Sequence, residues 1–387
     1  MPIQFHQGLA IVEVRIEGLD RLARLAIDSG AVTAISRDLA SELAFDVDRS
    51  VASPFVEDGM KRAVDAEPIL LRHLSVGKHT FQHVPAVLIA PDVFRVACVP
   101  IDGVLGTGGL SSAPGFLEQV AVEINRDLRR VRLARDGSLL GEEGDITLPL
   151  RRYLVDENGE KIDDASTWIP VLLEGQFLWA VLDTGGAGPS TMTRDVFSFI
   201  GRSVDDEDVR HYLGHDGMYA GGPSDTNLIA EVRDVQLGRF RFDTRPFSIM
   251  EPRKDGIPMV VLNQNLLEHF NIVLDYQASE VRVSLAESRP ATDERPLELA
   301  WHILEGRVVI LGMLADGAAQ QAGIEVGDEV VKVNDAEVSG EDQQAICDER
   351  MRWHASQNPL RLTLRRNGHE FDVTLPRMEP RPGRVVP

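Results

Sequence analysis

Cysteine is scarce in this 387-residue chain, which contains only Cys98 and Cys347. Two cysteines so far apart indicate neither a disulfide framework nor a zinc cluster. Long hydrophobic runs are also lacking: the longest, at 177–182 and 308–314, fall well short of the roughly 18 residues that span a bilayer. Basic residues are in deficit, with 40 Lys and Arg against 61 Asp and Glu, a formal charge of −21. These absences disfavour membrane insertion and nucleic acid as a partner.

The amino-terminal segment has no basic region and no small-residue cleavage site, so it does not read as a secretion signal. We therefore expect a cytoplasmic protein, or a periplasmic one if the sequence is a trimmed form of a longer chain. The chain is also too long for one hydrophobic core, since domains average about 150 residues. Two or three domains are expected.

An internal repeat organises the first three quarters of the chain. LARLAIDSGA, which ends at Ala31, is echoed by QFLWAVLDTGG, which ends at Gly186, and the aspartates Asp28 and Asp183 lie 155 residues apart. Flanking segments follow in the same order at similar offsets: VRIEG and VLLEG, VGKHTF and LGRFRF, DGVLGTGGL and MVVLNQNLL, VEINRDLRRVRLA and IVLDYQASEVRVSLA. A constant order with a small drift in spacing indicates one duplicated unit with insertions in its loops.

The repeated segments are short, alternating and rich in Val, Ile and Leu, which predicts a mainly β fold. We expect two β lobes, at 1–145 and 146–290, related by a pseudo-twofold axis, with helices limited to short pieces such as Ser36–Leu43. A polar linker at 288–296 would lead to a small α+β domain at 296–380. That domain would contain a helix at 343–354 and a hairpin closed by Asn367-Gly368.

Each repeat places an aspartate at the end of an apolar strand, followed by a hydroxyl residue and a glycine. A buried isolated carboxylate is costly, so neighbouring N–H and hydroxyl groups must hold it. If the two units face each other, Asp28 and Asp183 converge, share one proton and split their titrations. One member then acts as an acid and the other as a base that activates water. This chemistry requires neither a metal nor a cofactor.

The doubled DSG and DTG, each followed about 80 residues later by an apolar segment (GVLG at 103–106, VVLN at 260–263), resemble retropepsin-like aspartic peptidases. The arrangement is similar to the pepsin type, with both lobes in one chain, over roughly 290 residues. GRVVILGML, AGIEVGDEVVKVNDAEV and LRRNGHEF resemble a PDZ domain of bacterial type. Together they imply an aspartic endopeptidase whose substrate is a polypeptide and whose PDZ domain captures a substrate or a regulator.

The resemblance implies a role for each motif residue. Asp28 and Asp183 would be the catalytic pair, Ser29 and Thr184 would brace it, Gly30 and Gly185 would orient the carboxylates, and Gly103–Gly106 would pack behind the first acid loop. Ala31 and Gly186, which follow the motifs, are assigned to the substrate-binding surface. A peptide would add as a strand beside Arg307, Val308, Val309 and Ile310, next to the helix at 343–354. The alternative for this region is a packing domain with a blocked groove, since it lacks a GLGF loop.

Three departures from the pepsin pattern carry expectations. Asn263 stands where the second lobe should have a glycine, which would weaken packing behind Asp183. Ala31 and Gly186 replace residues that commonly carry a hydroxyl, and the loss of such a hydrogen bond should raise a carboxyl pKa. We therefore expect a pH optimum nearer neutral than that of pepsin. The candidate covering loops are 50–67 and 211–225.

Two other functional classes stay open. The lobes and the PDZ-like domain could form an inactive peptide-binding or adaptor protein, because fold does not fix function. A metal-dependent hydrolase using His211 and His215 is the other alternative, although the flanking glycines argue against a helix there and no third ligand is evident. The acidic run at 205–208 is interpreted as a solvated loop, because its spacing does not match an ion-binding loop.

Overall fold

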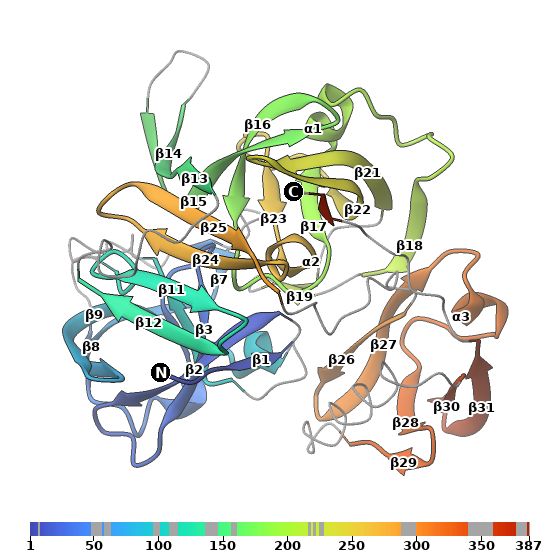
Figure 1. The fold of residues 1–387 in the computed structure, drawn as a ribbon. Coiled ribbons are helices and arrows are strands. Elements are labelled where there is room, and N and C mark those ends of the chain that lie inside the picture. Colours follow the sequence, from blue (N-terminus) through green and yellow to red (C-terminus); the bar gives the residue numbers. More distant parts are fainter. Residues whose placement is uncertain are drawn as a thin grey trace.

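The computed structural model describes residues 1–6, 8–47, 56–57, 63–95, 101–107, 115–135, 146–155, 161–215, 218–219, 222–223, 228–287, 299–339, 359–376 and 385–386. The described fold is mainly β, as predicted from the alternating segments (Figure 1). Its few helices are short: η1 (Arg37–Leu39), η2 (Pro91–Arg95), α1 (Arg194–Phe199), α2 (Gln264–Leu267) and α3 (Ala318–Gln321).

The first lobe is an eight-stranded sheet whose second strand also pairs with its seventh, so the sheet curls on itself. In spatial order its strands are β1 (Gln4–His6), β2 (Leu9–Ile16), β3 (Ala23–Asp28), β10 (Gly103–Gly106), β4 (Ala34–Ser36), β9 (His79–Ile89), β8 (Glu67–Val76) and β5 (Phe45–Val47). Strands β2 and β3 alternate apolar residues into one shared core, which includes Val14, Leu25 and Ile27.

The second lobe repeats this topology strand for strand. Its strands follow the order β15 (Lys161–Leu173), β16 (Gln176–Leu182), β23 (Val260–Leu262), β17 (Ser190–Thr193), β22 (Phe240–Met250) and β21 (Leu228–Leu237), with β14 (Arg151–Val155) at one end. Strands β16 and β23 are parallel, as β3 and β10 are, and β15 closes onto β21 as β2 closes onto β8. The duplication inferred from the sequence is therefore visible in the strand order.

A separate five-stranded sheet joins the two lobes (Figure 1). Its strands are β12 (Arg130–Ala134), β11 (Ala121–Asn125), β24 (Phe270–Asp275), β25 (Glu280–Leu285) and β13 (Ile146–Pro149). The central pairing, Val122 with Leu274 and Ile124 with Ile272, connects the carboxyl-terminal hairpins of the two repeats. The lobes are consequently held in one orientation by backbone hydrogen bonds.

The carboxyl-terminal region, orange to red in Figure 1, has its own apolar core. Its strands are β26 (Leu299–Leu304), β27 (Arg307–Leu314), β28 (Glu329–Val333), β29 (Ala336–Glu337), β30 (Leu360–Arg366) and β31 (His369–Leu375). The expected turn between β30 and β31 is confirmed, because Asn367 and Gly368 both have positive φ, at 49° and 80°. The helix expected at 343–354 and the linker at 288–296 lie outside the described residues.

Strand β18 (Arg210–Gly214) joins this region to the second lobe. It pairs with β21 on one side and with β27 on the other, with Tyr212 opposite Leu314 and Gly214 opposite Gly312. Strand β32 (Val385–Val386) returns the chain to β22. The carboxyl-terminal region is therefore part of a sheet that continues from the second lobe, and 210–214 is a strand where the sequence suggested a loop.

Two further sequence expectations are refined by the fold. The helix expected at Ser36–Leu43 is only the short η1, and the Ser36 side chain makes no capping hydrogen bond. Each expected covering loop contains a two-stranded hairpin: β6 (Val56–Glu57) with β7 (Ala63–Val64), and β19 (Met218–Tyr219) with β20 (Gly222–Pro223). No helix in the described part of the chain is long and apolar enough to cross a membrane.

Candidate active site

Both motif aspartates sit at the end of a strand that is held by parallel pairing. Asp28 ends β3 opposite Gly106 of β10, and Leu182, just before Asp183, pairs with Leu262 of β23. At Gly106, an added Cβ would lie 2.2 Å from the carbonyl oxygen of Ala31. The GVLG segment therefore packs directly behind the first motif, as the resemblance implied.

Four hydrogen bonds cross between the motifs. The Ser29 amide donates to the Thr184 hydroxyl (3.0 Å), and the Thr184 amide donates to the Ser29 hydroxyl (3.1 Å). Thr184 Oγ1 in turn donates to the Ile27 carbonyl (2.8 Å), and Ser29 Oγ donates to the Leu182 carbonyl. All of these groups are buried. Each hydroxyl thus ties the opposite lobe's strand to its own motif, which brings the aspartates together.

The two carboxyl groups meet across the motif glycines. A Cβ added to Gly30 would lie 2.7 Å from Asp183 Cγ, and one added to Gly185 would lie 2.2 Å from Asp28 Cγ. Only glycine leaves room for this approach. The Gly30 and Gly185 amides also donate to the carboxylate of their own motif, each at 2.9 Å. The site therefore places two carboxyls, each supplied with backbone donors, against one another.

Burial raises the pKa of both aspartates, and the shift is larger for Asp28. The neighbouring Asp183 charge raises the pKa of Asp28 further, whereas the hydrogen bond between the two carboxyls favours the ionised form of Asp183. Asp28 is 9% exposed and Asp183 is half-buried. These directions favour a single proton shared by the pair over a range of pH.

Two side chains of the second lobe, the buried Thr167 and the partly buried Tyr276, support the first motif. Thr167 Oγ1 on β15 donates to the Ser29 carbonyl (2.9 Å) and contacts the hydroxyl of Tyr276. The Tyr276 ring packs on the apolar cores of both lobes, and burial raises the pKa of its phenol. This chain of contacts fixes the backbone next to Asp28.

Arg126 occupies the corresponding place behind the second motif. Its guanidinium donates to the Gln264 side chain (2.8 Å) and to the carbonyls of Phe270 and Gly8, while Gln264 Nε2 donates to the Thr184 carbonyl (2.6 Å). Burial lowers the pKa of Arg126 to about 10.

The sequence analysis did not identify these four supporting residues. The repeat does align Arg126 with Tyr276, because both follow the strands in which Ile124 corresponds to Leu274. Their chemistry differs completely, however, so the alignment alone gives no functional signal.

The remaining predicted site residues have mixed outcomes. The backbone amides of Ala31 and Gly186 face the carboxyls of Asp28 and Asp183, so both residues lie at the pair. Arg307–Ile310 do not meet the pair and lie on β27, which β26 pairs along one edge, while Val309 pairs with Glu329 along the other. Both edges are occupied, so an added peptide strand does not fit beside Arg307, Val308, Val309 and Ile310.

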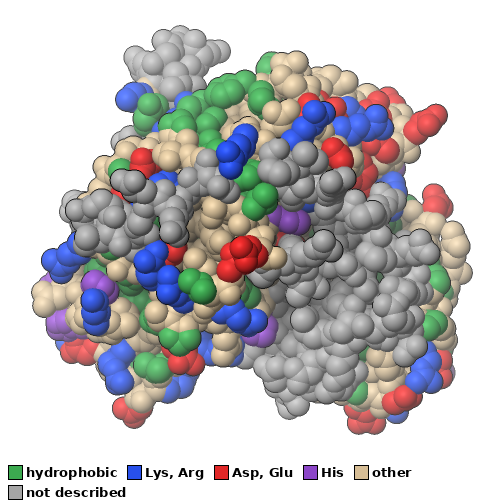
Figure 2. Space-filling view, viewed as in Figure 1, with side chains coloured by type: hydrophobic (Ala, Val, Ile, Leu, Met, Phe, Trp, Pro, Cys, Tyr) green, Lys and Arg blue, Asp and Glu red, His purple; other side chains and the backbone are tan. Residues whose placement is uncertain are grey.

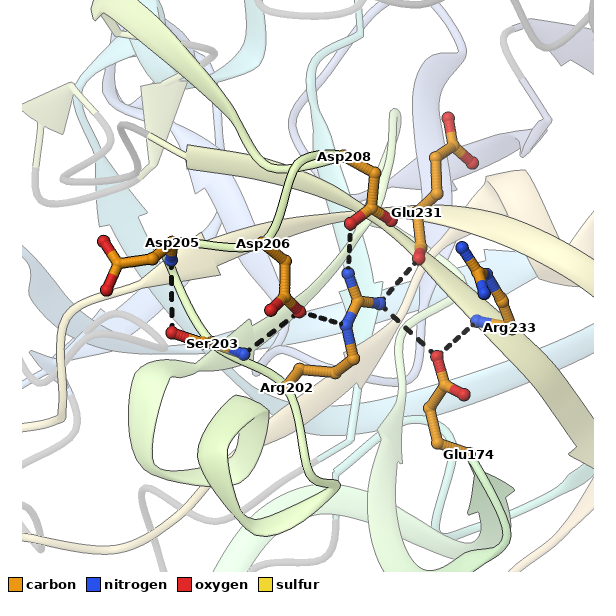
Figure 3. Close-up of polar contacts among 8 residues, drawn as sticks. All are labelled: Glu174, Arg202, Ser203, Asp205, Asp206, Asp208, Glu231 and Arg233. Atoms are coloured by element: carbon orange, nitrogen blue, oxygen red, sulfur yellow. Dashed lines mark hydrogen bonds and ion pairs between the residues drawn. The ribbon is translucent and has the colours of Figure 1, made fainter.

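The acidic run in the second lobe is part of an arginine-centred cluster (Figure 3). Arg202 donates to Asp206 (2.6 Å), to Asp208 (2.5 Å) and to the Glu231 carbonyl (2.9 Å). The hydrogen bond from Arg202 lowers the pKa of Asp206. Among the described residues, no three His, Cys, Asp or Glu side chains are placed to hold a metal ion. On the face of the molecule shown in Figure 2, basic and acidic side chains are interspersed.

The comparison with known proteins agrees with the geometry of the first lobe. Residues 12–108 match the family model described as aspartyl protease, a span that contains Asp28 and Gly103–Gly106. No curated protein matches the chain. The second motif lies outside the matched span and is related to it by the internal repeat. The chain therefore contains an aspartyl-protease-like region within a mainly β, two-lobed fold.

Proposed function

We propose that the chain is an aspartic endopeptidase that hydrolyses peptide bonds with a water activated between Asp28 and Asp183. The observation that carries the proposal is the pair of hydrogen-bonded carboxyls, one buried and one half-buried, held together by the reciprocal Ser29 and Thr184 contacts. Structural aspartates at the ends of strands do not need to share a proton, and such a pair is costly to bury. The aspartyl-protease match of the first lobe supports the same function.

We assign the role of acid to Asp28 and that of base to Asp183, because the pKa of Asp28 is raised further. Asp183, the ionised member, takes a proton from water while the water oxygen attacks the carbonyl carbon of the peptide bond. Asp28 gives its proton to the carbonyl oxygen, which would otherwise become an alkoxide. Asp183 then passes the proton that it took from water to the amine nitrogen, the C–N bond breaks, and Asp28 recovers a proton from a hydroxyl of the tetrahedral intermediate as the carbonyl re-forms. Hydrolysis is thus complete without a covalent enzyme intermediate. The amides of Gly30 and Gly185 hold both carboxyls in place through these steps.

The pH profile of cleavage tests this proposal. Activity requires Asp183 ionised and Asp28 protonated, and the pKa of each is raised. We therefore expect a bell-shaped profile of kcat/KM whose maximum lies well above the usual pKa of an aspartate, about 3.9. The substrate is a reduced, alkylated and therefore unfolded protein, and a chelator in a parallel reaction serves as the control.

The outcomes separate the candidate functions. Cleavage confined to strong acid would contradict the raised pKa values, and loss of cleavage in the chelator would favour the metal-dependent alternative. If the protein does not cleave the unfolded substrate between pH 3 and 8 but still binds it, the result would instead identify an inactive peptide-binding protein.

We further propose that the carboxyl-terminal region holds part of a long substrate. Because both edges of β27 are occupied, the remaining strand for peptide addition is β26, which among the described residues pairs only with β27 and is also approached by η2 of the first lobe. In Figure 1, β26 is on the side of this region that faces the first lobe. A chain captured there is presented at a fixed position, because β18 and β27 join this region to the second lobe. Capture would raise the local concentration of substrate at the pair.

Weakening the pairing between β18 and β27 should affect the cleavage of long and short substrates differently. A Cβ on Gly312 would lie 2.3 Å from the His215 carbonyl oxygen, so Gly312→Ala forces β27 away from β18. We expect KM for an unfolded protein to rise about fivefold or more, while kcat/KM for an eight-residue peptide changes less than twofold. Amide exchange within 210–214 should accelerate, which reports the separation directly.

The matched control is Gly317→Ala. It is the same substitution in the same region, and its added Cβ would meet its nearest atom only at 3.0 Å. An equal effect of Gly312→Ala on both substrates would show that the region does not capture substrate.

A further inference from the structure

Asn263 stands behind the second motif at the position where the first lobe has Gly106. The two positions share a backbone arrangement: the Asn263 amide donates to the Ser190 hydroxyl and the Gly106 amide donates to the Thr33 hydroxyl, each at 3.1 Å. The side chain is the difference between the lobes. Asn263 is 7% exposed, so its amide group needs partners within the protein.

One of the two polar atoms of the Asn263 side chain has a hydrogen-bond partner. Asn263 Nδ2 donates to the Pro189 carbonyl at 2.6 Å, and this bond fixes which end of the amide is the oxygen. Asn263 Oδ1 is buried and has no hydrogen-bond partner among the described residues. It is therefore an acceptor without a donor, more than nine-tenths buried, within the site.

The oxygen is directed toward the outer side of Asp183. The point where a Cβ of Gly186 would stand lies 2.3 Å from Asn263 Oδ1 and 2.8 Å from Asp183 Oδ2. The two oxygens thus flank the same bare glycine. Asn263 Oδ1 is shielded from solvent, so water does not reach it in this arrangement. The donor that can serve Oδ1 is a proton on Asp183 itself.

We propose that Asn263 is a positioning residue of the active site, whose Oδ1 accepts a hydrogen bond from Oδ2 of Asp183 whenever Asp183 carries a proton. This inference rests on the proposed function. Asp183 takes that proton from water as the C–O bond forms, and Asn263 then keeps it on the outer oxygen. The inner oxygen, which accepts from Gly185, stays directed at the partner aspartate.

The consequence for titration follows from the form that is stabilised. A hydrogen bond to a protonated carboxyl raises its pKa, so removal of the acceptor should lower the pKa of Asp183. Among the described residues, the titratable side chain that acts on Asp183 is Asp28, whose charge also raises the pKa of Tyr276. The acid limb of the kcat/KM profile reports the ionisation of the base, so this limb should move and the basic limb should not.

The test compares Asn263→Ala with Asn265→Ala. Asn265 is also an amide at α2, but its oxygen accepts from the Ser190 hydroxyl and its nitrogen donates to the Pro246 carbonyl. Among the described residues, no hydrogen bond joins the Asn265 side chain to either aspartate. We expect Asn263→Ala to move the acid limb down by about half to one pH unit, the worth of one hydrogen bond. Asn265→Ala should leave the limb in place. A limb that is unmoved, or moved upward, by Asn263→Ala overturns the proposal.

A double variant tests the same geometry from the other side. Gly186→Ser alone collides with Asn263 and should fold poorly. Asn263→Ala removes the two nearest colliding atoms, so that only Asp183 Oδ2, at 2.8 Å from the added Cβ, has to shift. In Gly186→Ser/Asn263→Ala the new hydroxyl can donate to ionised Asp183. The acid limb should then move lower than in Asn263→Ala alone, and the same position for both variants would contradict the assigned contact.

A stability measurement keeps the test independent of catalysis. Because the contact forms with protonated Asp183, its stabilisation is present at low pH and is lost as the pH rises through the pKa of the folded state. Asn263→Ala should therefore lose more stability to urea at pH 4 than at pH 7, whereas Asn265→Ala should lose the same amount at both. Equal losses for Asn263→Ala reject the inference even if the protein cleaves peptides, and absence of cleavage rejects only the proposed function.

Discussion

Substitution of either aspartate by asparagine should lower kcat/KM for an unfolded protein by about two to four orders of magnitude, which is the range for loss of a general acid or base. Asp183→Asn removes the base that takes a proton from water. Asp28→Asn keeps a donor toward Asp183 but cannot release a proton to the carbonyl oxygen. The loss should therefore be complete within the sensitivity of the assay for Asp183→Asn and nearly so for Asp28→Asn.

The same substitutions should not weaken the fold at neutral pH. Burial raises the pKa of Asp28 well above the unfolded value, so its favourable contribution is present at low pH and is lost as the pH rises through the pKa of the folded state. An uncharged amide avoids that loss. We expect the Tm of Asp28→Asn at pH 7 to equal or exceed that of the wild type, by calorimetry at matched buffer and concentration.

An exposed carboxylate provides the control for both effects. Asp46 forms an ion pair with Arg72 at 3.0 Å on the surface of the first lobe, away from the motifs. Asp46→Asn makes the same chemical change and should alter kcat/KM and Tm little, because exposed pairs contribute little. Wild-type activity in either motif variant would show that the buried pair is not the catalytic centre.

The aspartate pair could be predicted because the duplication is visible as a repeated sequence motif. Asp28 and Asp183 were placed together because the repeat fixes equivalent strand ends, and two equivalent units can meet about one axis. Ser29, Thr184, Gly30 and Gly185 followed from the same local pattern. Here spacing along the chain and position in space are linked by symmetry.

Other features depend on contacts that symmetry does not fix. Tyr276 and Arg126 occupy matched positions but reach the motifs through different neighbours, Thr167 and Gln264. Nothing in the sequence pattern of one element identifies its partner on another.

The edges of the sheets were unpredictable for a similar reason. Alternation in β27 predicts a strand but not its neighbours, so the sequence analysis left an edge free beside Arg307–Ile310. That edge is occupied, and β18 extends the same strand's pairing further along, where two glycines, Gly214 and Gly312, allow the backbones to approach. Edge pairing is decided by tertiary packing rather than by the periodicity of one strand.

Replacement of Thr184 by valine should destabilise the protein by about 2–4 kcal/mol, although the two side chains have the same shape. The Thr184 hydroxyl accepts from the Ser29 amide and donates to the Ile27 carbonyl, and all three residues are buried. Valine leaves both of these backbone groups without a partner in the protein interior. The cost is the desolvation of two polar groups, which urea unfolding measures directly.

Activity should fall together with stability in this variant, because the hydroxyl connects the lobes at the carboxyls themselves. A misplacement of about 1 Å between reacting groups can cost about a hundredfold in rate, so we expect kcat to fall more than KM rises. Thr184→Ser retains the hydroxyl and should stay close to the wild type in both measurements. Combining Thr184→Val with Ser29→Ala should cost less than the two single losses together, since both act on one junction. A Thr184→Val protein within about 0.5 kcal/mol of the wild type would show that the crossed hydrogen bonds do not hold the lobes together.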